Sequence, residues 1–165
     1  MKTLCMIVIG LAIAQTADPQ ITISSPAFKA DGTIPARFTC KGANQNPPLQ
    51  FRGIPKAAKS LVLIVDDPDA PGGLFTHWLV WNIAPVETQF RENSVPTGAV
   101  QGTNDFGQAG YGGPCPPSGT HRYYFRLLAL DQGLDLKPGA KRAGLERALK
   151  GHILARGELM ARFSH

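Results

Sequence analysis

Residues that bind ligands or transfer protons cluster in three short segments of this 165-residue chain. The first, 66–71, reads Asp-Asp-Pro-Asp-Ala-Pro and places three carboxylates within four residues. The second is His77, which follows Asp67 by ten residues and opens an apolar run. The third, 112–123, is rich in glycine and proline and ends in His-Arg-Tyr. Carboxylates, imidazoles and a phenol together indicate a site for a small polar ligand.

The residue types in these segments favour a phosphate-like anion. His77, His121 and the Tyr123 hydroxyl can each donate a hydrogen bond to a phosphate oxygen. Glycines let backbone N–H groups approach an anion closely. The prolines stiffen both loops, and a cis bond before any of them would alter the turn. Phe75 and Trp78 are candidates for apolar walls.

The aspartates raise a conflict, because Asp66, Asp67 and Asp69 would repel an anion. A nearby aspartate can keep a histidine protonated, and crowded carboxylates can themselves hold a proton. A zwitterionic head group removes the conflict differently, since its phosphate meets the histidines while its ammonium meets the carboxylates. The sequence therefore predicts a pocket for a phosphate-like anion or a zwitterionic head group that carries a phosphate and an ammonium.

Catalytic alternatives use the same residues. Asp67 with His77 or His121 makes a pair of general base and orienting carboxylate. The same three residues also match a metal site of two histidines and one carboxylate. Ser118 is the nearest candidate nucleophile, but it lacks a Gly-x-Ser-x-Gly turn. Because no complete catalytic set is visible, we expect a protein that is not an enzyme and holds no metal or cofactor.

Apolar patterns predict the strands that hold these residues. Ser60–Val65 is continuously apolar and β-branched, which is typical of a central strand covered on both faces. Residues 121–129 alternate, so His121 and Tyr123 share the apolar, inward face of one strand. Residues 101–120 contain six glycines and three prolines without a period, and a loop of this length tends to be functional.

The strand 77–83 also alternates. Strict alternation places His77 on one face with Leu79, Trp81 and Ile83, and places Trp78 on the other face.

The rest of the chain adds short strands and one late helix. We expect strands at 21–24, 37–40 and 49–51, and a helix at 141–150 between Pro/Gly and Gly punctuation. Residues 159–163 fit a closing strand or an extension of the helix. The prediction is a mostly β, sandwich-type domain with one or two C-terminal helices.

The first residues are typical of a targeting segment. Met1-Lys2 is followed by the uncharged apolar run Leu4–Ala14, which is too short to span a bilayer. We expect a signal peptide, 1–14, with an alternative cut after residue 17, no transmembrane segment, and a periplasmic or secreted domain at 20–165. The alternative is a buried N-terminal strand or helix.

Cleavage would leave two cysteines, Cys40 and Cys115. In an exported chain these can form a disulfide. The alternative is two small buried thiols. Their spacing does not match a metal site, which uses close pairs.

The formal net charge is +5, and the excess of lysine and arginine lies in 137–165. This is compatible with an acidic partner or an anionic membrane surface, but the usual explanation, which we favour, is a solvated basic helix. Nucleic acid is not predicted, because no aromatic residues alternate with the basic ones and no reader motif is present.

Several ordered motifs carry a resemblance to a known family. They are Asp67-Pro68-Asp69-Ala70-Pro71, His77, Gly113-Pro114 and Ser118-Gly119-Thr120-His121-Arg122-Tyr123, with Asp31-Gly32, Ile34-Pro35, Cys40 and Gly151-His152-Ile153-Leu154-Ala155. With them the chain, from about residue 21 to 163, resembles the phosphatidylethanolamine-binding protein family, also called Raf kinase inhibitor-like proteins, in its bacterial branch.

The resemblance implies a β-sandwich-like fold and a small pocket for phosphate-like anions and phosphorylated head groups. It implies that Asp67, His77, Gly113, His121 and Tyr123 line the pocket, with Pro71 shaping its rim. It carries no established catalytic chemistry.

The resemblance also implies protein partners, since eukaryotic members restrain kinases and some members inhibit serine proteases. Thr76 stands where animal members have a second histidine, which argues against a kinase-like partner. Three functions are therefore weighed: a binding module for phosphate-like ligands, an exported serine-protease inhibitor acting through a loop such as 101–113, and a phosphoester hydrolase.

Overall fold

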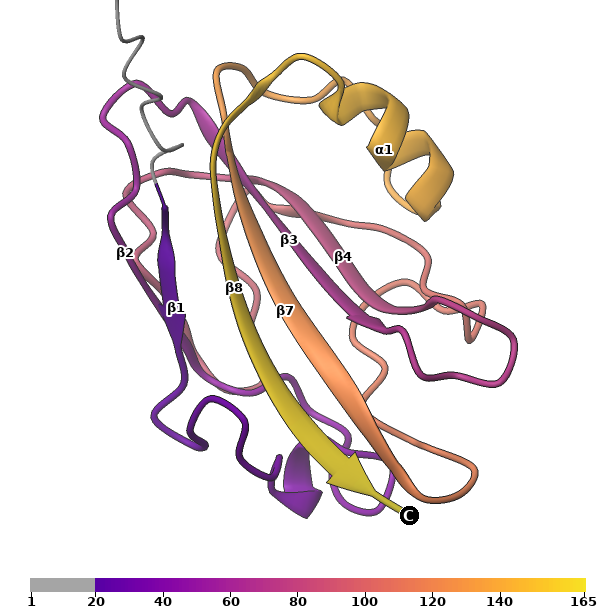
Figure 1. Cartoon of the computed structure of the whole chain (residues 1–165). Helices are drawn as coiled ribbons and strands as arrows, with labels where there is room; N and C mark the ends of the chain where they lie inside the picture. The colour runs from indigo at the N-terminus through magenta and orange to yellow at the C-terminus, as the bar shows by residue number, and fades with distance from the viewer. Residues whose placement is uncertain (1–19) are drawn as a thin grey trace, which may run out of the picture.

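The computed structural model describes residues 20–165, which form two antiparallel sheets and one α-helix (Figure 1). The predicted signal peptide, 1–14, and its alternative cut after residue 17 lie outside these residues. Within the described part of the chain, no helix is long and apolar enough to cross a membrane.

The smaller sheet has the order β1-β2-β5, with β1 at Thr22–Ser24, β2 at Leu49–Arg52 and β5 at Gln89–Phe90. The larger sheet has the order β6-β4-β3-β7-β8, formed by β6 (Val100–Gln101), β4 (Phe75–Ile83), β3 (Ser60–Asp67), β7 (Thr120–Leu130) and β8 (Ile153–Ser164). The short 3-10 helix η1 spans Ala36–Phe38, and the helix α1 spans Arg142–Leu149.

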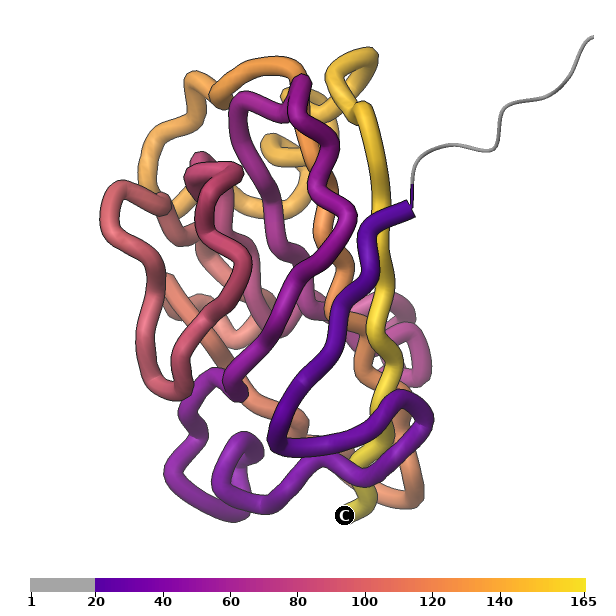
Figure 2. Tube along the Cα trace, turned by 90° about the vertical axis from the view of Figure 1, so that its left-hand side faces the viewer, coloured from indigo at the N-terminus to yellow at the C-terminus, as the bar shows by residue number. Residues whose placement is uncertain are grey.

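The larger sheet is covered on both faces. Figure 1 shows α1 against one face and the small sheet against the other, and Figure 2 shows the small sheet from its outer side. The main core lies between the sheets and includes Trp78, Tyr123 and Phe125. A second core lies under α1, where Leu145 and Leu149 pack on the sheet. Burial of these apolar surfaces supplies the main stabilisation of the fold.

Most predicted elements are confirmed. β3 is the middle strand of the large sheet and every residue in it is buried, as its continuous apolar run predicts. The inward face of β7 carries His121 and Tyr123, as its alternation predicts. The short strands near residues 21 and 49 and the helix near residue 142 are also present. The sandwich-type β fold with one C-terminal helix is therefore confirmed.

One element prediction is wrong. Residues 37–40 do not form a strand, because Pro35 begins the 3-10 turn of η1 and Phe38 donates its N–H to the Pro35 carbonyl. For residues 159–163 the closing-strand alternative is confirmed, since they belong to β8, which pairs with β7 along its whole length. The cis alternative for the proline turns is also not seen, because residues 20–165 contain no cis peptide bond.

β4 departs from strict alternation at two bulges. Val65 of β3 pairs with Trp78, but Asp66 pairs with Thr76, so His77 is an extra residue in β4. A second irregularity follows at Asn82, where φ is +55°. As a result Ile83 joins the inter-sheet core with Trp78, and not the α1 side with Leu79 as alternation predicted.

Candidate functional site

Three strand ends meet at one end of the large sheet. β3 runs antiparallel to both β4 and β7, so the last residue of β3 lies beside the first residues of its two neighbours. This brings together Asp67 at the end of β3, His77 near the start of β4, and His121 and Tyr123 near the start of β7. The topology thus assembles residues that are 54 positions apart in the sequence.

His121 is held by Asp67. The His121 Nδ1 lies 2.7 Å from the Asp67 Oδ2, and both side chains are almost fully buried. The other oxygen of Asp67 accepts the backbone N–H of Asp69 at 2.8 Å, which fixes the carboxylate in its turn. Because Nδ1 of His121 is engaged, Nε2 is the ring nitrogen left for a ligand.

His77 is held by a backbone carbonyl. Its Nδ1 lies 2.7 Å from the Gly112 carbonyl oxygen, so Nδ1 carries the proton and donates it. The bulge turns His77 toward β7, where its ring packs on the edge of the Tyr123 ring at 5.2 Å between centroids. Burial lowers the pKa of His77 below 6.5, against the opposing effects of the Gly112 hydrogen bond and the Asp67 charge. His77 is therefore neutral at pH 7, with Nε2 unprotonated.

Tyr123 packs against the His77 ring on the core side. Its hydroxyl oxygen is buried and has no hydrogen-bond partner among residues 20–165. Burial, and then the charge of Asp67, raise the pKa of this phenol, so it keeps its proton.

A cavity of about 130 Å³ opens between these side chains. Its lining includes four of the six predicted site residues, Asp67, Pro71, His77 and His121. Phe75, a predicted apolar wall, also lines it. The other lining residues are Ala70, Phe106, Cys115 and Pro117.

Gly113 lies behind the wall rather than in it. Its N–H is donated to the Asn44 Oδ1 at 2.7 Å and is not available to an anion. A Cβ at this position would lie 2.5 Å from the Phe38 carbonyl oxygen, so the close approach of the two segments requires glycine. Gly113 thus positions Gly112, whose carbonyl fixes His77.

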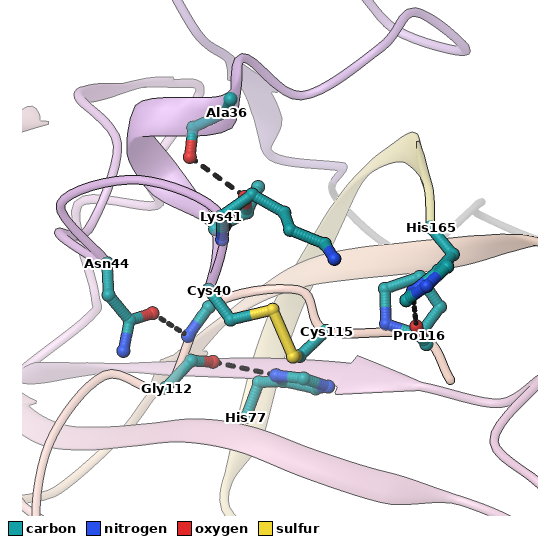
Figure 3. Close-up of a disulfide and its surroundings, with 11 residues drawn as sticks. Ala36, Cys40, Lys41, Asn44, His77, Gly112, Cys115, Pro116 and His165 are labelled. Atoms are coloured by element: carbon teal, nitrogen blue, oxygen red, sulfur yellow. Dashed lines mark hydrogen bonds between the residues drawn. A yellow bond between two sulfur atoms is a disulfide. The ribbon is translucent and has the colours of Figure 1, made fainter. Parts of the chain in front are cut away.

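A disulfide closes this wall. The structure joins Cys40, just after η1, to Cys115 of the glycine-rich loop, as Figure 3 shows beside His77 and Gly112. Cys40 also donates its N–H to the Pro114 carbonyl at 3.1 Å. The bond spans 75 positions of sequence, and a loop of that length corresponds to about 4 kcal/mol in the chain-entropy model.

Phe106 is a lining residue that the sequence did not single out. Two hydrogen bonds join Asp105, the residue before Phe106, to Thr76 of β4. The Thr76 N–H donates to the Asp105 carboxylate at 2.6 Å, and the Asp105 N–H donates to the Thr76 carbonyl at 2.9 Å. Phe106 then packs on Phe75 and His77, with ring centroids 4.7 and 5.4 Å away. Phe106 lies in a loop without periodicity, and its aromatic type in a polar, Gly-rich stretch was the only signal.

Other candidates lie outside the cavity. Trp78 is not a wall of the site, because its ring is fully buried in the core and its Nε1–H is donated to Gln101. Ser118 is exposed and does not line the cavity. No group of three histidine, cysteine, aspartate or glutamate side chains in the described part of the chain is arranged to hold a metal ion.

Comparison with known proteins places the chain in a family. The family model for phosphatidylethanolamine-binding protein matches residues 24–164. A UPF0098 protein of Methanothermobacter thermautotrophicus is 50% identical over 145 residues, covering 85% of this chain and 96% of that protein. A UPF0098 protein of Pyrococcus abyssi is 47% identical over 165 residues, covering 95% of this chain and 93% of that protein. This chain belongs to the phosphatidylethanolamine-binding protein family.

Solved structures agree with this assignment. The phosphatidylethanolamine-binding protein homolog CT736 of Chlamydia trachomatis superimposes with a TM-score of 0.85 at 42% identity, covering 89% of this chain and 99% of that chain. YbcL of E. coli, reported as a member of the mammalian family, has a TM-score of 0.83 at 32% identity, covering 88% and 99%. The restriction to a bacterial branch is wrong, because archaeal proteins are among the similar relatives.

Proposed function

We propose that this chain is a non-catalytic binding protein whose cavity takes a phosphate-like anion or the phosphoethanolamine head group of a lipid. One observation carries the proposal. Both imidazoles have Nδ1 fixed by a protein acceptor, the Asp67 carboxylate for His121 and the Gly112 carbonyl for His77. Each ring therefore offers Nε2 to the same small cavity.

The size and lining of the cavity support a head group rather than a whole lipid. Its volume of about 130 Å³ is well below the roughly 300 Å³ at which drug-sized ligand pockets begin. Tyr123 does not line the cavity and supports it from the core, where its ring packs against His77. Aromatic rings of Phe75 and Phe106 form the apolar side, where the methylene groups of a head group would pack.

The proposal predicts a pH dependence. A bound anion stabilises a protonated His77, so it raises the pKa that burial has lowered, and binding takes up a proton. Affinity should therefore increase as the pH falls below the ordinary value of 6.5. Export and a protein partner are further proposals, which rest on the sequence of residues 1–14 and on the family resemblance.

Calorimetric titration tests the proposal. Phosphoethanolamine, inorganic phosphate and sulfate are titrated at about pH 5.5 and about pH 7.5; sulfate keeps one charge state across this range and isolates the protein's own titration. We expect tighter sulfate binding at the lower pH and at least about a tenfold loss of affinity in His121→Ala, which corresponds to the free energy of one charge-assisted hydrogen bond.

His152→Ala is the matched control, because His152 also contacts an aspartate, Asp131, with its Nδ1 at 3.0 Å, but on the surface. Its affinity should equal that of the parent. Equal affinity of the His121→Ala variant and the parent would refute the proposal. Release of phosphate from phosphoethanolamine would instead support the third function, a phosphoester hydrolase.

A further inference from the structure

A second cavity, of about 260 Å³, borders the same glycine-rich loop and shares no lining residue with the anion cavity. Five of its ten lining residues are asparagine or glutamine, and none carries a charge. Tyr111 supplies aromatic surface, and its ring packs edge to face on the buried Trp78 ring at 5.4 Å between centroids. An uncharged lining rich in amides is distinct in its chemistry from the histidine cavity.

Two of the amides are locked in one orientation. The Gln101 Oε1 accepts the Trp78 Nε1–H at 2.8 Å, and the Asn44 Oδ1 accepts the Gly113 N–H at 2.7 Å. An indole N–H and a backbone N–H can only donate, so the oxygen of each amide must face them. The NH₂ groups of Asn44 and Gln101 therefore remain as donors, and neither has a hydrogen-bond partner among residues 20–165.

The walls of this cavity are preformed. Asn46 joins the wall formed by residues 44–46 to the wall formed by residues 93–95. Its Oδ1 accepts the Ser94 N–H at 3.0 Å, and its Nδ2 donates to the Arg91 carbonyl at 3.0 Å. Tyr111 is fixed by donating its hydroxyl to the Phe38 carbonyl at 2.8 Å. Burial raises the pKa of this phenol, which keeps the wall uncharged at neutral pH. A rigid site loses little conformational entropy when it binds a ligand.

These features select a ligand class. The fixed NH₂ groups require acceptor oxygens, and the Ser94 hydroxyl can either donate or accept. No charged lining residue compensates an ionic ligand, which disfavours carboxylates, phosphates and ammonium ions. We propose that this cavity binds an uncharged polyhydroxyl ligand of the size of a sugar ring, with the amide groups of Asn44 and Gln101 donating to its hydroxyl oxygens.

Nuclear magnetic resonance offers a direct test, because the chain has two tryptophans. Glucose, galactose and N-acetylglucosamine are titrated separately into ¹⁵N-labelled protein. At least one sugar should shift the indole N–H of Trp78 and the side-chain NH₂ signals of Asn44 and Gln101. The Trp81 indole, buried in the core under α1, should not move. Absence of shifts with all three sugars would overturn the proposal.

Isosteric variants identify the site. Asn44→Asp and Gln101→Glu keep the acceptor oxygens that hold Gly113 and Trp78 but lose the NH₂ donors, so each should weaken sugar binding by at least about tenfold. Gln50→Glu, on the exposed side of β2, is the matched control and should bind as the parent does. Sulfate binding should be retained in Gln101→Glu and Gln50→Glu, which do not contact the wall of the anion cavity. Sugar binding that survives both variants, or that sulfate displaces competitively, would refute this assignment.

Discussion

Asp66 and Asp67 are consecutive residues of β3, yet they lie on opposite faces of the large sheet. Asp66 faces α1, is fully buried, and pairs with Arg126 and with Arg142, whose Nη1 lies 2.9 Å away. Asp67 faces the small sheet and holds His121 at the cavity. The first carboxylate contacts two cations and ties the helix to the sheet, while the second contacts an imidazole that has one nitrogen left for a ligand.

This difference removes the conflict between three aspartates and an anion. Asp69, the third of the group, accepts hydrogen bonds from two Arg122 nitrogens, Nε at 2.9 Å and Nη2 at 2.6 Å. The Arg122 guanidinium holds the pKa of Asp69 at about 2. Two of the three charges are thus neutralised by arginine, and only Asp67 borders the cavity together with the histidines. The alternation of side chains along a strand divides one acidic cluster into structural and binding roles.

The largest effect on stability is expected from Asp66→Ala. Removing this carboxylate leaves Arg126 and Arg142 without their buried partner, which costs about 3 kcal/mol of unfolding free energy, the lower end for a broken buried pair. Urea denaturation gives this value. Sulfate affinity should be unchanged, because α1 lies on the other face of the sheet. A parallel loss of affinity would show that the two faces are not separate.

A smaller loss of stability but a larger loss of binding is expected from Asp67→Ala. The buried His121 Nδ1–H loses its acceptor, a cost of about 1 to 3 kcal/mol. His121 is then free to turn, so sulfate affinity should fall by about tenfold. Urea denaturation and calorimetry measured on the same sample give both numbers. If Asp67→Ala binds sulfate as tightly as Asp66→Ala, the carboxylate does not position the histidine.

The smallest effect is expected from Arg122→Gln, and it depends on pH. The pKa of Asp69 is lowered in the folded state, so the pair stabilises the protein above the ordinary value of 3.8 and loses this contribution as the pH falls through about 2. The stability difference between parent and variant, followed by urea denaturation, should therefore shrink between about pH 4 and about pH 2. A stability difference that stays constant over this pH range would mean that the ion pair between Arg122 and Asp69 does not account for it.

Sequence patterns predicted the binding wall on β7 better than the wall on β4. His121 and Tyr123 follow the period of a regular strand, and the apolar character of their face gave its direction. His77 reaches the same cavity only because a bulge inserts it as an extra residue, and no period in the sequence shows a bulge. Its place beside His121 was proposed from residue type and family motif.

The glycine-rich loop shows a second limit. Its length and composition indicated function, but the roles of its residues depend on contacts far along the chain. Gly113 was expected among the ligand groups, yet its N–H bonds to Asn44, 69 positions earlier. Phe106 reaches the cavity because hydrogen bonds join the neighbouring Asp105 to Thr76, and no local sequence pattern predicts these bonds. Loop side chains are placed by tertiary contacts, so a single sequence identifies their segment but not their direction.

The titration of His77 tests the central claim most directly. The pH dependence of its Cε1–H resonance is followed by nuclear magnetic resonance with and without sulfate. We expect a pKa below 6.5 in the free protein, an upward shift with sulfate, and a simultaneous shift of the His121 resonance, while the signal of His152 does not respond to sulfate. A His77 titration that sulfate leaves unchanged, with no response of His121, would contradict the assignment of this cavity as an anion site.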